Sequence, residues 1–159
     1  MTCSDIPLSE GGRQQVEQWK IPSEIDGFKW IASPLSRARD TALAAGAALG
    51  LEPTYDEALM EFHAGEWQGE YMSEMIRPYF RGETSPEGGE SFEVFAERAW
   101  GAIRRAAALG PETLIVCHGG LWYAMRRYHE IAPDMTPMPN AAPIRVTPQD
   151  GVWRAERLG

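Results

Sequence analysis

Residues 113–120 read Thr-Leu-Ile-Val-Cys-His-Gly-Gly, and this stretch decides the fold. Its apolar half shows no polar alternation and lies between Pro111 and two glycines, which is typical of a short central strand buried on both faces. His118 follows at the end of that strand, and the glycines precede a helix expected from about Leu121 to Ile131. The order strand, histidine, helix indicates an α/β fold with a parallel sheet.

A second stretch has the same order. Trp30-Ile31-Ala32 is a short apolar run that ends at Ser33, so it predicts another buried strand running into a loop. Pro34 then opens a helix to about Leu49, with Gly50 as its stop. Arg37 lies in the first turn of that helix.

The rest of the chain continues the alternation. We expect helices at residues 8–20 with Ser9 as N-cap, at 71–80, and from 92 until Pro111, a short strand around 54–55, a helix-free polar loop at 82–90, and a terminal hairpin of 144–146 with 152–154 that turns at 150–151. No repeat or long linker divides the sequence. It therefore predicts one α/β domain over residues 1–159 with a mainly parallel sheet.

The composition is that of a globular protein, with 159 residues, 43% hydrophobic and 24% charged. The net charge of −8 argues against a nucleic-acid partner, because phosphate backbones need a basic surface. No apolar run is long enough to span a membrane and no signal-peptide pattern is present, so the expected location is the cytoplasm. Cys3 and Cys117 form no disulfide framework or metal-ligand spacing, and Cys117 is interpreted as a small buried residue rather than a catalytic thiol.

Ligands of such sheets bind at the carboxyl ends of the strands, where Ser33 and His118 stand. The helix start at Gly119, with its free backbone N–H groups, and the planar fork of Arg37 together indicate a phosphate site. Each residue alone has a plainer interpretation: the arginine as a surface residue, the histidine as a structural one, and Glu61 as an exposed acid. Their combination in this order favours the phosphate site.

Five segments extend this pattern over nearly the whole chain. They are 5–14, Asp-Ile-Pro-Leu-Ser-Glu-Gly-Gly-Arg-Gln; 33–38, Ser-Pro-Leu-Ser-Arg-Ala, with Thr41; 59–69, Leu-Met-Glu-Phe-His-Ala-Gly-Glu-Trp-Gln-Gly; 88–91, Gly-Gly-Glu-Ser; and 118–120, His-Gly-Gly. In their order and spacing the chain resembles the histidine phosphatase (phosphoglycerate-mutase-like) superfamily. The resemblance implies a three-layer sandwich with a mainly parallel central sheet flanked by helices, and hydrolysis of a phosphomonoester through a phosphohistidine.

The resemblance also implies the roles of individual residues. By position, Arg37 resembles the second phosphate-clamping arginine, Glu61 the general acid, and His118 the second histidine, which binds phosphoryl oxygens. Gly119 is expected to bind phosphate beside Arg37 and His118. The implied enzyme is a metal-independent phosphomonoesterase that needs no cofactor and acts on a small molecule as a monomer or homodimer.

One part of the family pattern is missing from this sequence. The nucleophilic histidine belongs to an Arg-His-Gly motif on a strand before the Asp5 segment, and no histidine precedes Ser33. The resemblance places that strand between those ending at Ser33 and His118. Without it, either the two neighbouring strands close up, or another chain fills the gap, or the natural protein is longer by about 20 to 25 residues, which is the favoured explanation. For these 159 residues we expect negligible turnover. Of the other histidines, His63 follows Glu61 in a loop, and a place in the pocket wall is the less favoured interpretation for it. His129 is interpreted as structural.

Three functions stay open: a phosphatase, a non-catalytic relative that binds phosphorylated ligands through Arg37 and His118, and a sugar-phosphate mutase. The mutase is disfavoured because mutases of this family carry longer insertions around the site than the segment between Gly65 and His118 allows. The substrate stays open as well. The variable stretch offers apolar side chains that suit either a pocket mouth or, as the favoured interpretation, a helix's core face: Tyr71, Met72, Met75, Tyr79 and Phe80.

Overall fold

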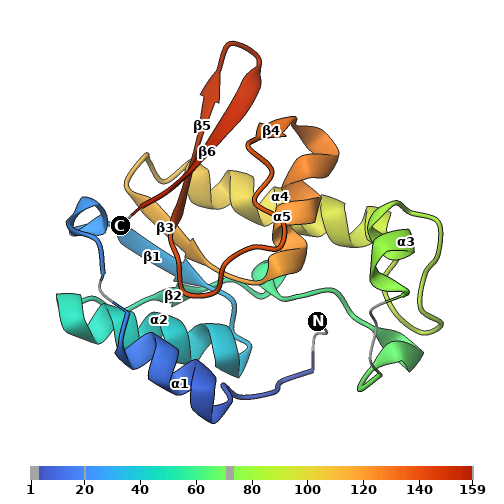
Figure 1. The fold of residues 1–159 in the computed structure, drawn as a ribbon, viewed down its shortest axis with the longest axis horizontal. Helices are drawn as coiled ribbons and strands as arrows, with labels where there is room; N and C mark the ends of the chain where they lie inside the picture. Colours follow the sequence, from blue (N-terminus) through green and yellow to red (C-terminus); the bar gives the residue numbers. More distant parts are fainter. Residues whose placement is uncertain (1–3, 20, 71–73, 159) are drawn as a thin grey trace.

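The computed structural model describes residues 4–19, 21–70 and 74–158. The α-helices are α1 (Glu10–Glu17), α2 (Ser36–Leu49), α3 (Ile76–Phe80), α4 (Phe92–Ala107) and α5 (Gly119–Tyr128); the strands are β1 (Lys29–Ala32), β2 (Thr54–Tyr55), β3 (Thr113–Val116), β4 (Ile131–Ala132), β5 (Ile144–Gln149) and β6 (Val152–Arg157). Short 3-10 turns cover Ser23–Ile25, Glu57–Leu59 and Gly65–Trp67. Strands and helices alternate along the chain, so the predicted α/β class is confirmed (Figure 1).

β1 lies between β2 and β3 in a parallel sheet. It pairs with β3 along its whole length, with Ala32 opposite Val116. Of the outcomes left open for the missing strand, the described residues show the first: the strands that end before Ser33 and His118 close up and are hydrogen-bonded to each other. Direct pairing satisfies backbone N–H and C=O groups that a gap would leave buried without partners.

Helices cover both faces of this sheet, because alternate strand residues point to opposite sides. Trp30 of β1 packs with α2 in one buried cluster, which Leu114 of β3 joins. The neighbouring Ile31 belongs instead to a cluster with α4 and α5, which Ile115 of β3 joins. Figure 1 shows the strands between α2 below and α4 with α5 above. The three-layer arrangement implied by the resemblance is thus present.

β3 is an edge strand of the described sheet, and all its residues are half-buried. The sequence predicts instead a central strand buried on both faces, and this prediction is wrong for the described part of the chain. An unbroken apolar run indicates that both faces of a strand are covered by other elements. It carries no information on whether the strand has one neighbour or two.

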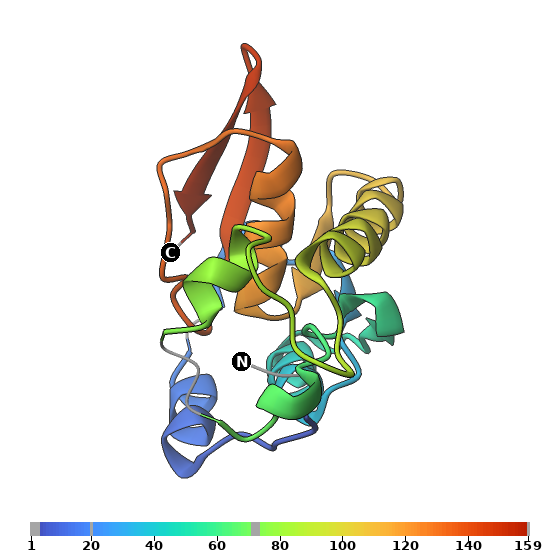
Figure 2. The same cartoon turned by 90° about the vertical axis from the view of Figure 1, so that its right-hand side faces the viewer.

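The chain ends in a second sheet, in which β6 lies between β4 and β5. β5 and β6 form the predicted antiparallel hairpin, and its turn residues Asp150 and Gly151 both have positive φ, as a type I′ turn requires. Both strands run longer than the predicted segments. In Figures 1 and 2 the hairpin extends beyond the helices, away from α1 and α2.

Most helix ends follow their capping signals. The Ser9 hydroxyl accepts a hydrogen bond from a backbone amide in the first turn of α1, and Gly50 closes α2 in the left-handed conformation. α5 ends at Tyr128, short of the predicted end, because Ile131 joins β4. Within the described part of the chain, no helix combines the length and apolarity that a membrane crossing needs.

The helix predicted at residues 71–80 is described only in its second half, as α3, and residues 71–73 lie outside the described part of the chain. Tyr79 is completely buried in the cluster shared by α4 and α5, and Phe80 packs half-buried against it. For these two residues the core interpretation is confirmed. Tyr71 and Met72 lie outside the described residues.

Candidate active site

Ser33 and His118 meet at the carboxyl edge of the parallel sheet, Ser33 directly after β1 and His118 two residues after the end of β3. The pairing of β1 with β3 continues one step further, because Ser33 N–H donates to the Val116 carbonyl at 2.9 Å. The Ser33 Oγ atom lies 2.8 Å from Nε2 of His118, and it also accepts a hydrogen bond from Leu35 N–H at 3.3 Å. The ladder of the sheet therefore fixes the distance between the two side chains.

His118 is uncharged at neutral pH. Burial, followed by the positive charges of Arg37 and Arg98, lowers its pKa to about 3. Ser33 is fully buried, so its hydroxyl proton needs a partner, and Nε2 of the neutral imidazole accepts it. In the tautomer in which Nε2 accepts from this hydroxyl, the ring proton resides on Nδ1 and that nitrogen is a hydrogen-bond donor.

Arg37 lies in the first turn of α2, and its side chain is half-buried. Its Nη1 donates to the Ser4 carbonyl at 2.8 Å. The next residue along the N-terminal segment, Asp5, accepts a hydrogen bond from Ser36 N–H at 2.6 Å, and this bond holds the pKa of the Asp5 carboxyl below its usual range. The charge of Arg37 acts on the titration of both His118 and Glu61, so the structure brings the three predicted residues into one electrostatic site.

Glu61 is a buried acid, with 1% of its surface exposed, and not the exposed acid that a lone glutamate suggests. Its Oε2 accepts from Gly120 N–H at 3.1 Å and its Oε1 from Phe62 N–H at 3.2 Å. Burial raises the pKa of this carboxyl against the opposing effect of the two amides. A protonated carboxyl at higher pH than usual is what a general acid needs.

The start of α5 supplies one of the two amides that bind this carboxyl. A side chain on Gly120 would collide with Glu61 Oε1, so only glycine allows the helix to approach the acid this closely. Gly119 is the first residue of α5, and its amide precedes the hydrogen-bonded ladder of the helix, as a phosphate-binding amide must.

Sequence reasoning missed Arg98. Its guanidinium donates to the Glu90 carboxylate from Nε at 2.9 Å and from Nη2 at 2.7 Å. It also donates from Nη1 to the carbonyls of Ala58 and Met60, both at 3.0 Å. Glu90 stood within the quoted Gly-Gly-Glu-Ser segment, but Arg98 occupies an ordinary position on the polar face of a helix, and no local pattern marks it.

Two other residues considered from sequence lie outside the chemistry. His63 is exposed, and its Nδ1 accepts a hydrogen bond from Gly65 N–H at 3.3 Å. Its side chain therefore stabilises the turn of residues 63–65. Burial raises the pKa of the Cys117 thiol to about 12, and the charge of Glu61 adds to this rise. That thiol is protonated at neutral pH and is no nucleophile.

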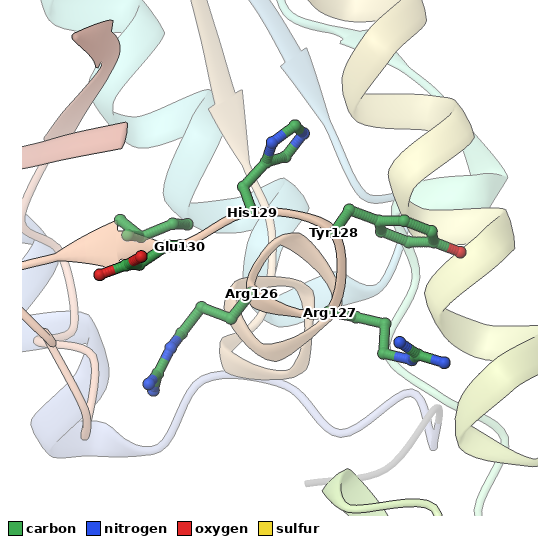
Figure 3. Close-up of a pocket in the computed structure, with 6 residues that line it drawn as sticks. Arg126, Arg127, Tyr128, His129 and Glu130 are labelled. Atoms are coloured by element: carbon green, nitrogen blue, oxygen red, sulfur yellow. The ribbon is translucent and has the colours of Figure 1, made fainter. Parts of the chain in front are cut away.

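His129 lies at the opposite end of α5 from His118. It borders a hollow of about 400 Å³ with Arg126, Arg127, Tyr128, Glu130 and Ile131. Its ring packs between Trp100 and Trp153, with ring centres 4.7 and 4.6 Å away, which supports the structural interpretation. Figure 3 shows the labelled side chains pointing in different directions around the helix end, so they do not converge on a common ligand.

The described residues contain no group of three or more histidine, cysteine, aspartate or glutamate side chains with the geometry of a metal site. The charge of Arg37 acts on both His118 and Glu61, and a guanidinium and an imidazole N–H are groups that can donate to an anion. The arrangement is suited to hold a phosphoryl group and to deliver a proton beside it.

Comparison with known proteins identifies the family of this chain. The model of the histidine phosphatase superfamily (branch 1) matches residues 2–159. Glucosyl-3-phosphoglycerate phosphatase of Mycobacterium tuberculosis is 31% identical over 140 residues, which cover 76% of this chain and 63% of that protein. The enzyme of the same name from Mycolicibacterium vanbaalenii is 32% identical over 139 residues, covering 76% of this chain and 62% of that protein. The match thus spans less than two thirds of the length of these relatives.

Solved structures share the fold over the whole chain. The mycobacterial glucosyl-3-phosphoglycerate phosphatase in complex with VO3 superimposes with a TM-score of 0.74 at 26% identity, covering 99% of this chain and 89% of that one. A protein from Thermus thermophilus gives a TM-score of 0.74 at 26% identity, covering 100% of this chain and 88% of that one. With a family match along almost its entire length, the chain belongs to branch 1 of the histidine phosphatase superfamily.

Proposed function

We propose that this chain carries the phosphate-binding and proton-donating part of a phosphatase that hydrolyses a small-molecule phosphomonoester. One observation carries the proposal: a buried carboxyl of raised pKa, a neutral imidazole and a half-buried guanidinium share one edge of a parallel sheet. The family and the phosphatases among its relatives support the reaction class.

Each side chain has a distinct task in this reaction. Arg37 binds two phosphoryl oxygens through its planar fork, and Nδ1–H of His118 donates to a third. Glu61 protonates the oxygen of the departing alcohol, a step that contributes roughly 10²–10⁴ in rate. Cationic and N–H donors of the protein stabilise the charge of the transferring phosphoryl group, so the proposed reaction is independent of metal.

His118 binds the phosphoryl group and does not attack it. Its Nε2 is engaged with the Ser33 hydroxyl, and the other two histidines of the sequence lie on the exposed turn at His63 and between tryptophans at His129. We therefore expect these 159 residues to form no phosphohistidine and to show negligible phosphomonoester turnover.

A non-catalytic function is the second candidate. It is favoured by the same engagement of His118 with Ser33, because a site that binds phosphate without a free histidine nucleophile acts as a receptor for a phosphorylated ligand. The two functions share Arg37 and His118 and differ in the need for Glu61, since binding alone requires no proton donor.

Phosphate binding tests the part that both functions share. We expect inorganic phosphate and vanadate to bind by calorimetry, and Arg37→Ala to weaken binding roughly tenfold or more, as the loss of a charged hydrogen bond does. Arg39→Ala is the matched control, because Arg39 stands on the same helix, is exposed and pairs with its neighbour Asp40. Equal affinity of the two variants would overturn the proposed clamp.

Measurements of turnover separate the two functions. The substrates are glucosyl-3-phosphoglycerate, chosen from the relatives, and a generic phosphomonoester. Hydrolysis of both is measured for the 159-residue chain and for a product extended by any in-frame codons upstream of Met1. Turnover of the extended product that falls in Glu61→Gln supports the phosphatase. Turnover of the 159 residues that is abolished by His118→Ala would show that His118 is the nucleophile and overturn its binding role.

A further inference from the structure

Two loops far apart in the sequence are held together beside the acid. Glu90 N–H donates to the His63 carbonyl at 2.9 Å, and His63 N–H donates back to the Glu90 carboxylate at 2.8 Å. The backbones approach so closely that a side chain on Gly89 would collide with the His63 carbonyl. The loop that follows Glu61 is therefore anchored to the segment that precedes α4.

Arg98 completes this anchor from the second turn of α4. Besides its two bonds to Glu90 and those to Ala58 and Met60, its Nη2 lies 3.5 Å from the Glu61 carbonyl. The guanidinium thus places all three of its nitrogens against acceptors, three of which are backbone carbonyls around the acid. Only arginine offers five donors in one plane, so lysine is no substitute here.

The ion pair of Arg98 and Glu90 is well placed to act on Glu61. Arg98 and Glu90 are only 26% and 19% exposed, so their charge-assisted bonds are partly shielded from water. The pull of Arg98 and of the His63 amide keeps the pKa of Glu90 below its usual range although burial opposes it. Glu90 is therefore a carboxylate throughout the neutral range, and the pair stays intact there.

We propose that Arg98 and Glu90 are positioning residues for Glu61. They hold the backbone of residues 58–63 so that the Glu61 carboxyl stays in position at the first turn of α5, where Gly120 and Phe62 donate to it. This role rests on the proposed function of Glu61 as the acid. The position and the pKa of the Glu61 carboxyl can nevertheless be measured in the protein without substrate.

Several titratable groups surround Glu61, and any change in its titration has to be separated from theirs. They are Arg37 from α2, Tyr79 from α3, Arg98 from α4, Cys117 after β3 and His118 before α5. Tyr79 and Cys117 have raised pKa values and His118 a lowered one, so all three are neutral around pH 6 to 8. Arg37 and Arg98 keep their charge.

The test follows the Glu61 carboxyl carbon by nuclear magnetic resonance in protein labelled with ¹³C at glutamate, with Glu61→Gln to assign the signal. Arg98→Lys and Glu90→Gln are expected to let water reach the carboxyl, so the pKa of Glu61 moves back toward the ordinary range of a glutamate. Exchange of the Phe62 and Gly120 amide hydrogens should accelerate roughly tenfold or more.

The matched control is Arg105→Lys. Arg105 stands on α4, two turns beyond Arg98, and forms an ion pair of similar length, 2.8 Å to Asp56, but it is 61% exposed. This variant should leave the titration of Glu61 and both amides unchanged.

A merely structural pair would lower the melting temperature of Arg98→Lys and Glu90→Gln without moving the Glu61 titration, and that result overturns the proposal. Circular dichroism shows whether each variant is folded, and the more conservative Glu90→Gln keeps the inference testable if Arg98→Lys unfolds. The readout needs neither phosphate nor turnover. A chain that fails to bind phosphate but shows the shifted titration would refute the proposed function and leave the positioning intact.

Discussion

The hydroxyl of Ser33 and Nε2 of His118, 2.8 Å apart, join the ends of two neighbouring parallel strands. Burial and the positive charges of Arg37 and Arg98 lower the pKa of the imidazole, and this bond accompanies its neutral state. A buried hydroxyl that donates to Nε2 stabilises the neutral ring and leaves its N–H on Nδ1, the form that hydrogen-bonds an anion without carrying charge.

The titration of His118 is the first prediction. Its ring signal in proton resonance spectra should stay flat from about pH 8 to 4, because its pKa is lowered from 6.5 to about 3. A histidine whose pKa is lowered on folding contributes stability above the unfolded value, and this stability is lost as pH falls from 6.5 toward 3. Urea unfolding should therefore show a smaller loss on acidification for His118→Asn than for the natural chain. A signal that titrates near 6.5 contradicts the bonded state.

Glu61 should show the opposite pH dependence. Its pKa is raised by burial, so its contribution to folding is fully present below the ordinary glutamate value and is lost as pH rises through the raised value. Glu61→Gln lacks this titration. The difference in unfolding free energy between the two proteins, measured in urea from about pH 4 to 8, should shift in favour of the variant as pH rises. A difference independent of pH would show that the carboxyl is not buried in solution.

Gly120→Ala should destabilise the protein by about 1–3 kcal/mol, because the added methyl group displaces the Glu61 carboxyl from the start of α5. Gly11→Ala is the control. Gly11 is an exposed helix residue with open space where its side chain would be, so alanine there should raise stability by about 0.5–1 kcal/mol through helix propensity. Urea unfolding measures both. Equal effects of the two substitutions would mean that α5 moves away from Glu61 without a loss of folding stability.

Cys117 should react slowly with iodoacetamide at about pH 8. Burial raises the pKa of its thiol to about 12, so the reactive thiolate is scarce in the folded protein. The experiment uses Cys3→Ser so that Cys117 is the remaining thiol, and mass spectrometry follows the modification with and without urea. Fast modification of the folded protein would reopen the hypothesis of a catalytic thiol.

The sequence predicted most of the elements and three site residues, because these depend on local patterns. Apolar runs mark β1 and β3, and Ser9 and Gly50 mark helix ends through their own backbone preferences. Arg37, Glu61 and His118 were predicted because their segments follow a family's order, and their roles stay a prediction.

What the sequence missed depends on contacts between distant segments. The neighbours of β3 are set by competition among all strands for backbone partners, which no single run encodes. Arg98 acts on a loop that lies 40 residues earlier in the chain, at Ala58. The burial of Glu61 likewise arises from the approach of α5, so the sequence alone suggests an exposed acid.

The register of β1 against β3 has a consequence for variation of this protein. Successive residues of a strand are about 3.3 Å apart and face opposite ways, so a slip of one position would turn His118 away from Ser33 altogether. The distance between Ser33 and His118 is thus set by the sheet, and it is insensitive to the length of the segments that connect the strands. Insertions in segments that connect these strands would therefore leave the contact between Ser33 and His118 unchanged. Variation of this protein is therefore limited first by the alignment of these two strands.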